Sequence, residues 1–281
     1  MNRSLVLPRE SERREFLAAL GASVIAPALG HAQQAPAEKF GGFRRNAIKV
    51  LTFDVGGTVF DWHRTVRDEV AAMSRRKDFH IDAAAFTNEW RLSVFRDVLP
   101  KVRRGELPFM NIDEVHRKVL DRLLEQHGVS GLDESERREL TYAWHRIKAW
   151  PDSRSGLAQL RSRFTVSGLS VLSLSLLVST SKAADLHWDA LVSCEFLGHY
   201  KPDPASYQKG VELLGFEIQG AMMVAAHPGD LRGARAAGLG TAYVPRPGEW
   251  GDDDDRVLES GEEFDVVAKD FNDLAVKLGA A

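Results

Sequence analysis

Cysteine is nearly absent from this chain of 281 residues, which contains a single one, Cys194. One thiol cannot form an internal disulfide, nor can it supply the set of thiolates in a cysteine-based zinc site. A large charge excess is also lacking, since 37 Lys and Arg and 40 Asp and Glu leave a formal net charge of −3. Nucleic-acid binders normally carry a clustered basic excess that displaces counterions. The composition therefore argues against nucleic acid as a partner and predicts a fold held together by burial alone.

The N-terminal part lacks an apolar run long enough to span a membrane. The uncharged run over residues 16–29 has about 14 residues, whereas a spanning helix needs roughly 20. It follows the pair Arg13-Arg14, and small residues stand at Gly30 and Ala32. This pattern resembles the bacterial twin-arginine export signal, so we expect cleavage near Ala32 and a periplasmic protein with no membrane contact afterwards. A short amphipathic helix at the N-terminus is the alternative.

Short apolar runs that alternate with helix-like segments are what the rest of the chain does contain. The first run, within AIKVLTFDVGGTVFDW, ends at Asp54 and a Gly-Gly-Thr turn, as expected for a buried parallel strand. Strand patterns return after residue 151 in FTVSGLSVL, DALVSCE, AMMVAAH, GTAYVPR and FDVVAKD. Such a β-α-β order requires a parallel sheet with right-handed crossovers. We therefore predict an α/β fold with a doubly wound, Rossmann-like sheet.

Between the first strand and the second, the pattern is helical. DAAAFTNEWRLSVFRDVL and IDEVHRKVLDRLLEQHG have apolar residues at helical spacing, and the stretches 111–113 and 133–135 supply cap-type residues. The helical block thus interrupts the α/β domain after its first strand. The predicted organisation is an export signal (1–32), a disordered leader (33–46), an α/β core (47–64 and 151–281) and an inserted helical cap (65–150).

Four polar pieces fall at strand ends in this interpretation. They are Asp54 with Thr58, Ser170, Lys201 and Asp230. The carboxyl ends of adjacent parallel strands meet at one edge of the sheet, so these groups can converge on one crevice. Each alone is typical of a cap or a turn. Together they outline a nucleophilic site, in which a lysine balances the charge of a desolvated carboxylate.

In order and spacing these four pieces resemble the motifs of the haloacid dehalogenase superfamily, and the resemblance extends over residues 50–274. The segments TFDVGGTVFDW, WPDSRSGLAQLRSRF, MMVAAHPGDLRGARAAGLGTAYVPRPGEWG and FDVVAKDFNDLA are similar to its 2-haloacid dehalogenase (type II) branch. The resemblance implies the haloacid dehalogenase fold with its inserted cap, and hydrolysis of short 2-haloalkanoic acids to 2-hydroxy acids. It implies that the protein needs no cofactor or metal. The expected partners are a small anionic substrate, water and halide, and some members of the family form a homodimer.

Carried onto this sequence, the resemblance makes Asp54 the nucleophile that forms a covalent ester. Asp230 would orient the water that hydrolyses the ester, and Lys201 would offset the carboxylate charges.

The resemblance also implies a set of binding residues. Thr58 and Ser170 would hold Asp54 or the substrate carboxylate, and Arg91 would bind the departing halide. Tyr207 matches a site residue, while His227 could orient water or contact the halide. A surface position for Arg91, and packing roles for Tyr207 and His227, are the alternatives.

The sequence departs from the pattern at three places. Gly56 stands where superfamily phosphatases carry a general acid, which favours attack at carbon over attack at phosphorus because a halide leaves without a proton. Val171 replaces the usual Asn after Ser170, and a serine-rich stretch, SLSLLVSTSKAAD, follows where a helix is expected. The alternatives are a magnesium-dependent phosphatase and a non-catalytic binding homologue.

Overall fold

The structure is a computed structural model that describes residues 39–40, 43–44, 47–252 and 256–281. The predicted export signal lies outside these residues, as does most of the predicted leader. Inside the leader, β1 (Lys39–Phe40) pairs antiparallel with β2 (Phe43–Arg44), so these four residues differ from the disordered chain that their composition predicts. In the described part of the chain, no helix combines the length and apolarity needed to cross a membrane.

A six-stranded parallel sheet forms the centre of the α/β part, in the spatial order β10-β9-β8-β3-β6-β7. Its strands are β3 (Val50–Phe53), β6 (Thr165–Ser170), β7 (Ala190–Ser193), β8 (Ala221–Ala225), β9 (Gly240–Tyr243) and β10 (Val266–Val267). The predicted α/β class with a parallel sheet is confirmed.

The middle of this sheet explains why polar groups meet there. All four residues of β3 are fully buried, because the strand lies between β6 and β8 and is covered on both faces. The chain continues from β3 to β6 on one side, and β8 later pairs on the other side. A ligand site is expected at such a switch point, outside the carboxyl ends of the strands. Asp54 is the first residue after β3.

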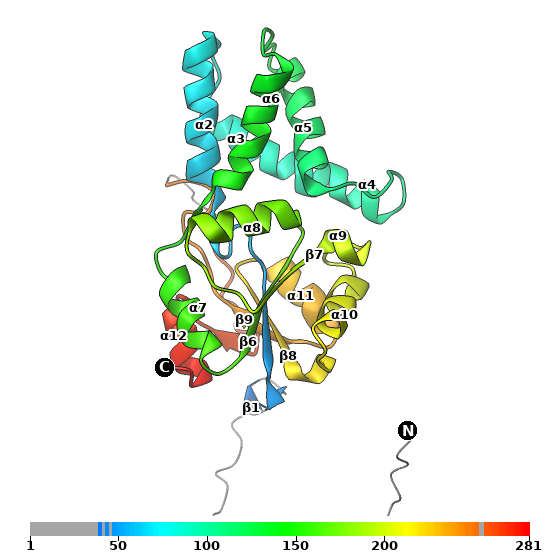
Figure 1. Cartoon of the computed structure of the whole chain (residues 1–281), viewed down its shortest axis with the longest axis vertical. Helices are drawn as coiled ribbons and strands as arrows, with labels where there is room; N and C mark the ends of the chain where they lie inside the picture. Colours follow the sequence, from blue (N-terminus) through cyan, green and yellow to red (C-terminus); the bar gives the residue numbers. More distant parts are fainter. Residues whose placement is uncertain (1–38, 41–42, 45–46, 253–255) are drawn as a thin grey trace, which may run out of the picture. The chain divides into compact units, whose positions relative to one another are not determined.

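Helices flank both faces of the sheet (Figure 1). They are α7 (Ser153–Arg161), α8 (Leu174–Ala183), α9 (Cys194–Leu197), α10 (Pro204–Leu213), the 3-10 turn η4 (Ile218–Gly220), α11 (Pro228–Ala236) and α12 (Phe271–Leu278). The serine-rich stretch does form a helix, α8, because the Ser173 hydroxyl caps it by accepting from the backbone N–H of Leu176. Serine is a good residue at a helix start even though it is a poor one inside a helix.

A second group of helices follows β4 (Phe60–Asp61). These are α2 (Trp62–Lys77), α3 (Ala83–Ser93), the π-helical segment η2 (Val94–Val98), α4 (Leu99–Arg103), α5 (Ile112–Gln126), α6 (Glu134–Thr141) and the 3-10 helix η3 (Tyr142–Arg146). As predicted, Asn111 caps α5 and Asp133 caps α6, the latter in a capping box with Glu136. The chain returns through β5 (Lys148–Ala149), which pairs antiparallel with β4. These two-residue strands are too short for a sequence pattern to reveal.

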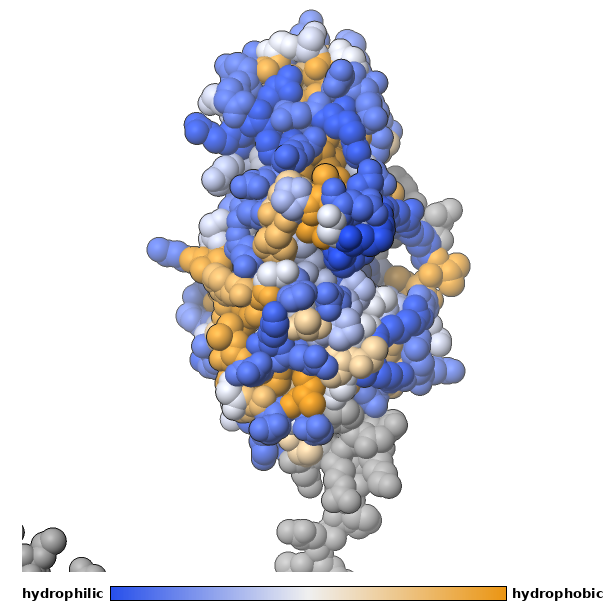
Figure 2. Space-filling model, turned by 90° about the vertical axis from the view of Figure 1, so that its right-hand side faces the viewer, coloured by the Kyte–Doolittle hydropathy of each residue, from blue (hydrophilic) through white to orange (hydrophobic). Residues whose placement is uncertain are grey.

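Aromatic side chains fill the interior of this helical group. Trp62 stacks on Trp144 at 5.7 Å between ring centroids, Trp90 meets Trp144 edge-on at 5.5 Å, and all three rings are almost wholly buried. Burial of one such ring is worth roughly 2–3 kcal/mol in transfer free energy. Figure 2 shows hydrophilic side chains over most of the visible face of this end of the molecule, in keeping with amphipathic helices that turn their apolar faces inward.

Candidate active site

Asp54 is held by three donors. The Lys201 ammonium lies 2.9 Å from Oδ1, while the Thr58 hydroxyl (2.8 Å) and His227 Nδ1 (3.0 Å) contact Oδ2. Burial alone would raise the pKa of Asp54, but the Lys201 charge and the hydrogen bond from His227 outweigh it and hold that pKa well below its usual range. Asp54 is therefore ionised, oriented and shielded from bulk water.

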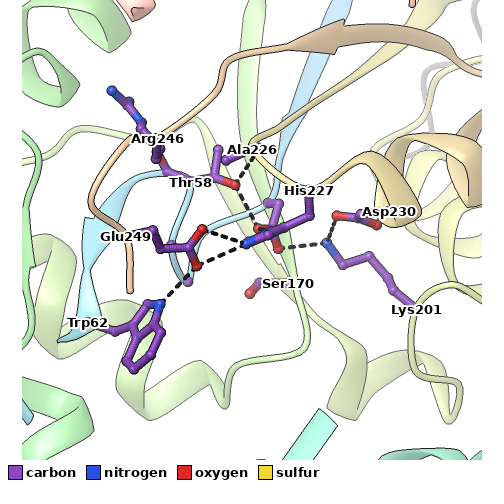
Figure 3. Close-up of polar contacts among 12 residues, drawn as sticks. Thr58, Trp62, Ser170, Lys201, Ala226, His227, Asp230, Arg246 and Glu249 are labelled. Atoms are coloured by element: carbon purple, nitrogen blue, oxygen red, sulfur yellow. Dashed lines mark hydrogen bonds and ion pairs between the residues drawn. The ribbon is translucent and has the colours of Figure 1, made fainter. Parts of the chain in front are cut away.

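A second carboxylate, Asp230, lies on the other side of the same lysine. Lys201 Nζ is 2.7 Å from Asp230 Oδ2 (Figure 3), and the Tyr207 hydroxyl donates to Asp230 Oδ1 at 2.5 Å. Burial raises the pKa of Asp230, and the nearby Asp54 charge adds to this effect against the opposing influence of Lys201. The environments thus push the two carboxyl pKa values apart, which is the usual sign of different roles for two acids in one site.

Two predicted site residues make other contacts than the sequence implies. Ser170 is fully buried, its hydroxyl accepts from the backbone N–H of Leu172 at 3.2 Å, and within the described residues no hydrogen bond joins it to Asp54. Tyr207 is fully buried and bonds Asp230, so it supports a carboxylate where we expected a substrate contact. Thr58 does contact Asp54, and it also accepts from the backbone N–H of Ala226 at 2.9 Å.

His227 has a partner that sequence reasoning missed. Its Nε2 lies 3.0 and 3.1 Å from the two carboxylate oxygens of Glu249, which also accepts from Trp62 Nε1 at 2.8 Å (Figure 3). Glu249 lies in the loop after β9, within PRPGEWG, where no strand-end rule points to chemistry. The only available signal is an acid next to Trp250 in a segment that resembles the family.

A cavity of about 500 Å³ opens above these groups. Its lining includes the charged residues Asp54, Lys201, His227 and Asp230 and the apolar residues Leu92, Phe95, Val171, Leu172 and Trp250. We call these two sets the charged floor and the apolar wall.

Arg91, from α3, belongs to the wall. It is 5 % exposed, its guanidinium lies 3.9 Å from the centroid of the Phe95 ring, and its Nη2 donates to the carbonyl of Gly56 at 3.3 Å. Among the described residues, its Nη1 has no hydrogen-bond partner. A guanidinium stays charged even where burial lowers its pKa, as here. A buried cation in the lining of a cavity is suited to bind an anion.

The contacts of this site do not suit a divalent cation between the two carboxylates. The Lys201 ammonium already bridges Asp54 and Asp230, and the Gly56 carbonyl accepts from Arg91. In the part of the chain that the structure describes, no group of three His, Cys, Asp or Glu side chains is arranged to hold a metal ion.

Comparison with known proteins agrees with the α/β fold described above. The model of the haloacid dehalogenase-like hydrolases matches residues 48–238. The chain belongs to this family. In this member of the family, Asp54 directly follows β3, and Lys201 lies between Asp54 and Asp230.

Individual relatives within the family are named 2-haloacid dehalogenases. The crystal structure of the defluorinating L-2-haloacid dehalogenase Rha0230 has a TM-score of 0.79 and 34 % identity, covering 83 % of this chain and 95 % of that one. Haloacetate dehalogenase H-2 of Moraxella sp. (strain B) is 25 % identical over 206 residues, 72 % of this chain and 87 % of its own. (S)-2-haloacid dehalogenase of Xanthobacter autotrophicus is 28 % identical over 203 residues, 71 % of this chain and 76 % of its own.

Proposed function

We propose that this hydrolase cleaves the carbon–halogen bond of short 2-haloalkanoic acids through an ester on Asp54. The observation that carries the proposal is that a fixed carboxylate and a buried cation line one cavity. Asp54 is ionised and held by three donors, and the Nη1 of Arg91 has no hydrogen-bond partner among the described residues. A nucleophile and a cation that line the same cavity suit displacement of a halide from carbon.

In the first step, one carboxylate oxygen of Asp54 attacks the α-carbon as the carbon–halogen bond breaks. The bonding electron pair leaves with the halide, whose charge appears only as the bond lengthens. Arg91 contributes its free N–H to that charge, so it stabilises the transition state more than the ground state. No proton donor is needed, which fits Gly56 two residues after the nucleophile.

In the second step, water attacks the ester carbon of Asp54 and yields a 2-hydroxy acid. Asp230 is the base for this water, since its raised pKa makes it a better proton acceptor than an ordinary carboxylate. Lys201 and Tyr207 hold Asp230 in place through the bonds described above. The Lys201 ammonium, which bridges the two acids, argues against a magnesium ion between them as in a magnesium-dependent phosphatase.

Halide release from chloro-, bromo- and fluoroacetate and from 2-chloropropionate tests the proposal. We expect halide and 2-hydroxy acid in equal amounts, with the same rate in the presence of a chelator. A protein that releases no halide, yet hydrolyses a phosphate monoester in a chelator-sensitive reaction, is a phosphatase. Binding of a 2-haloacid without turnover would instead identify a non-catalytic homologue.

A further inference from the structure

Glu249 is a buried acid that the reaction outlined above does not use. It is 5 % exposed, yet its carboxylate accepts hydrogen bonds from Trp62 and contacts His227. Burial alone would raise the pKa of Glu249, but the His227 charge and hydrogen bond outweigh it and lower that pKa. A carboxylate kept ionised in the interior is costly unless it is paired, and the group paired with it here is the imidazole that touches the nucleophile.

The local backbone is built around this carboxylate. Gly57 has a φ of +92°, and a Cβ at this position would lie 2.1 Å from Glu249 Oε1, so a glycine is required on both counts. Arg246 anchors the loop that carries Glu249. Its Nε donates to the Thr58 carbonyl at 2.8 Å, and its two terminal nitrogens pair with Asp152 at 2.8 and 2.9 Å.

The charges around His227 come from several elements. Asp54, after β3, and Glu249, after β9, contact the two ring nitrogens directly. Lys201 lies beyond Asp54, and Arg91 on α3 interacts electrostatically with Glu249. Burial alone would lower the pKa of His227, but the Glu249 charge and the hydrogen bonds to both acids outweigh it and raise that pKa to about 10. Only an imidazolium can donate from both nitrogens at once.

We propose that Glu249 is a positioning residue, which keeps His227 doubly protonated with its Nδ1–H on Asp54 Oδ2, so that His227 and Thr58 together stabilise negative charge on that oxygen during ester hydrolysis. This inference rests on the proposed function and adds to it an acid that no sequence motif indicated. His227 is then a catalytic donor and not a ligand of the halide, which fits its contact with the nucleophile through Nδ1.

The hydrolysis step shows why a cation at Oδ2 matters. Lys201 contacts Oδ1, and in our proposal this is the oxygen that forms the ester bond to substrate carbon. Water then forms a bond to Cγ, its proton passes to Asp230, and the carbonyl electron pair moves onto Oδ2. When the Cγ–Oδ1 bond breaks, Oδ1 leaves with the product and takes the proton from Asp230, and the second water proton is released as Asp54 ionises again. The donors at Oδ2 thus form an oxyanion hole.

Glu249→Gln tests the inference because it keeps the shape and the acceptor for Trp62 but removes the charge. We expect hydrolysis to slow by about 10- to 100-fold, less than the roughly 10²- to 10³-fold cost of removing an oxyanion-hole donor outright, because the His227 ring remains. The first halide release should slow less, so that a 1-carboxyalkyl ester of Asp54 accumulates in the intact mass spectrum. Glu89→Gln is the matched control, since it also removes an acid paired with a histidine, His127, at 2.8 Å on the surface. It should leave both steps unchanged.

Protonation of His227 gives a readout that mere structural damage would not mimic. In protein with ¹⁵N-labelled histidine, the resonance that disappears in His227→Asn belongs to this ring. We expect wild-type His227 to stay charged to about pH 10 and its titration midpoint to fall by more than about one pH unit in Glu249→Gln. The pH at which the rate declines on the alkaline side should shift downward by a similar amount in Glu249→Gln.

A double-mutant cycle separates positioning from stability. His227→Asn offers Asp54 a neutral amide, so adding Glu249→Gln to it should cost no further activity. An equal loss with and without His227 would overturn the inference, as would a Glu249→Gln protein with wild-type rates and pH profile. If Glu249→Gln fails to fold, Glu249→Asp with the same titration takes its place. These variants do not test the proposed function itself. That proposal would be refuted if the wild-type protein released no halide from any of the haloacids.

Discussion

The charged floor and the apolar wall of the cavity are built on different principles. On the floor, every ionised group contacts an opposite charge, with Lys201 between Asp54 and Asp230 and His227 between Asp54 and Glu249. On the wall, Arg91 lies against aromatic rings and keeps one N–H without a partner among the described residues. The floor is thus complete before substrate arrives, while the wall is complete only with an anion bound.

This difference assigns the chemistry to the floor and the recognition to the wall. Paired charges fix orientation and protonation state at no further cost during reaction, which is what a nucleophile and a base need. An unpaired buried cation, in contrast, lowers the free energy of any species that brings a negative charge to it. Substitutions on the floor should therefore cost more activity than substitutions on the wall.

Asp54→Asn should have the largest effect of all. The amide keeps the size of the side chain but is not a nucleophile, so we expect halide release to fall by at least about 10⁴-fold. Halide measured by ion chromatography is the readout. Asp189→Asn removes a carboxylate paired with Arg161 away from the cavity and is the control that should retain full activity. Activity in Asp54→Asn close to that of the control would break the assignment of chemistry to the floor.

Asp230→Asn should come next, at roughly 10³-fold, because it removes the base for water while Asp54 can still attack carbon. A stoichiometric burst of halide followed by slow turnover is the expected time course. In the wild type, activity should fall with decreasing pH as Asp230 takes up a proton. Since the pKa of Asp230 is raised, the midpoint of this fall should lie above 3.8, the ordinary pKa of an aspartate. A midpoint at or below pH 3.8 would mean that another group is the base.

Arg91→Met should cost about 10²-fold and should discriminate among halides. Fluoride is the poorest leaving group and has the most localised charge, so its release should suffer more than that of bromide. Arg122→Met, which removes an arginine paired with Asp97 at the surface of the helical group, is the control. An equal loss for all halides would show that Arg91 binds the substrate carboxylate. The wall would then bind the substrate and would not stabilise the departing halide.

Val171→Asn should have the smallest effect. Val171 is 7 % exposed and lines the wall, so an amide at this position can donate to the substrate carboxylate. We expect KM to fall by a few-fold with kcat nearly unchanged. A large change in kcat would indicate that this position influences the nucleophile, and it would remove the distinction between floor and wall.

Much of the floor could be predicted from sequence, because one topological rule places the strand ends of a parallel sheet together. Asp54, Lys201 and Asp230 meet for this reason, and Thr58 lies one turn from Asp54. Contacts within the floor were harder to predict. Ser170 is at its expected strand end, but its side chain is engaged by the backbone two residues later.

Glu249 and Trp62 were missed because tertiary packing alone brings them to His227. They lie 187 residues apart, in a loop and at the first position of a helix, and no local pattern links such positions. The wall is similar, since the contact of Arg91 with the Gly56 carbonyl depends on how the helical group packs over the sheet. The sequence predicted Arg91 as a binding residue but not which of its atoms would have partners.

Water labelled with ¹⁸O tests the central claim, the ester on Asp54, most directly. In a single turnover with excess enzyme, water attacks the carboxyl carbon, so one ¹⁸O should appear in the peptide that contains Asp54 and none in the 2-hydroxy acid. Repeated turnover should then carry the label into product. Label in the 2-hydroxy acid of the first turnover, with an unlabelled Asp54 peptide, would show that water attacks the substrate directly and would contradict the account.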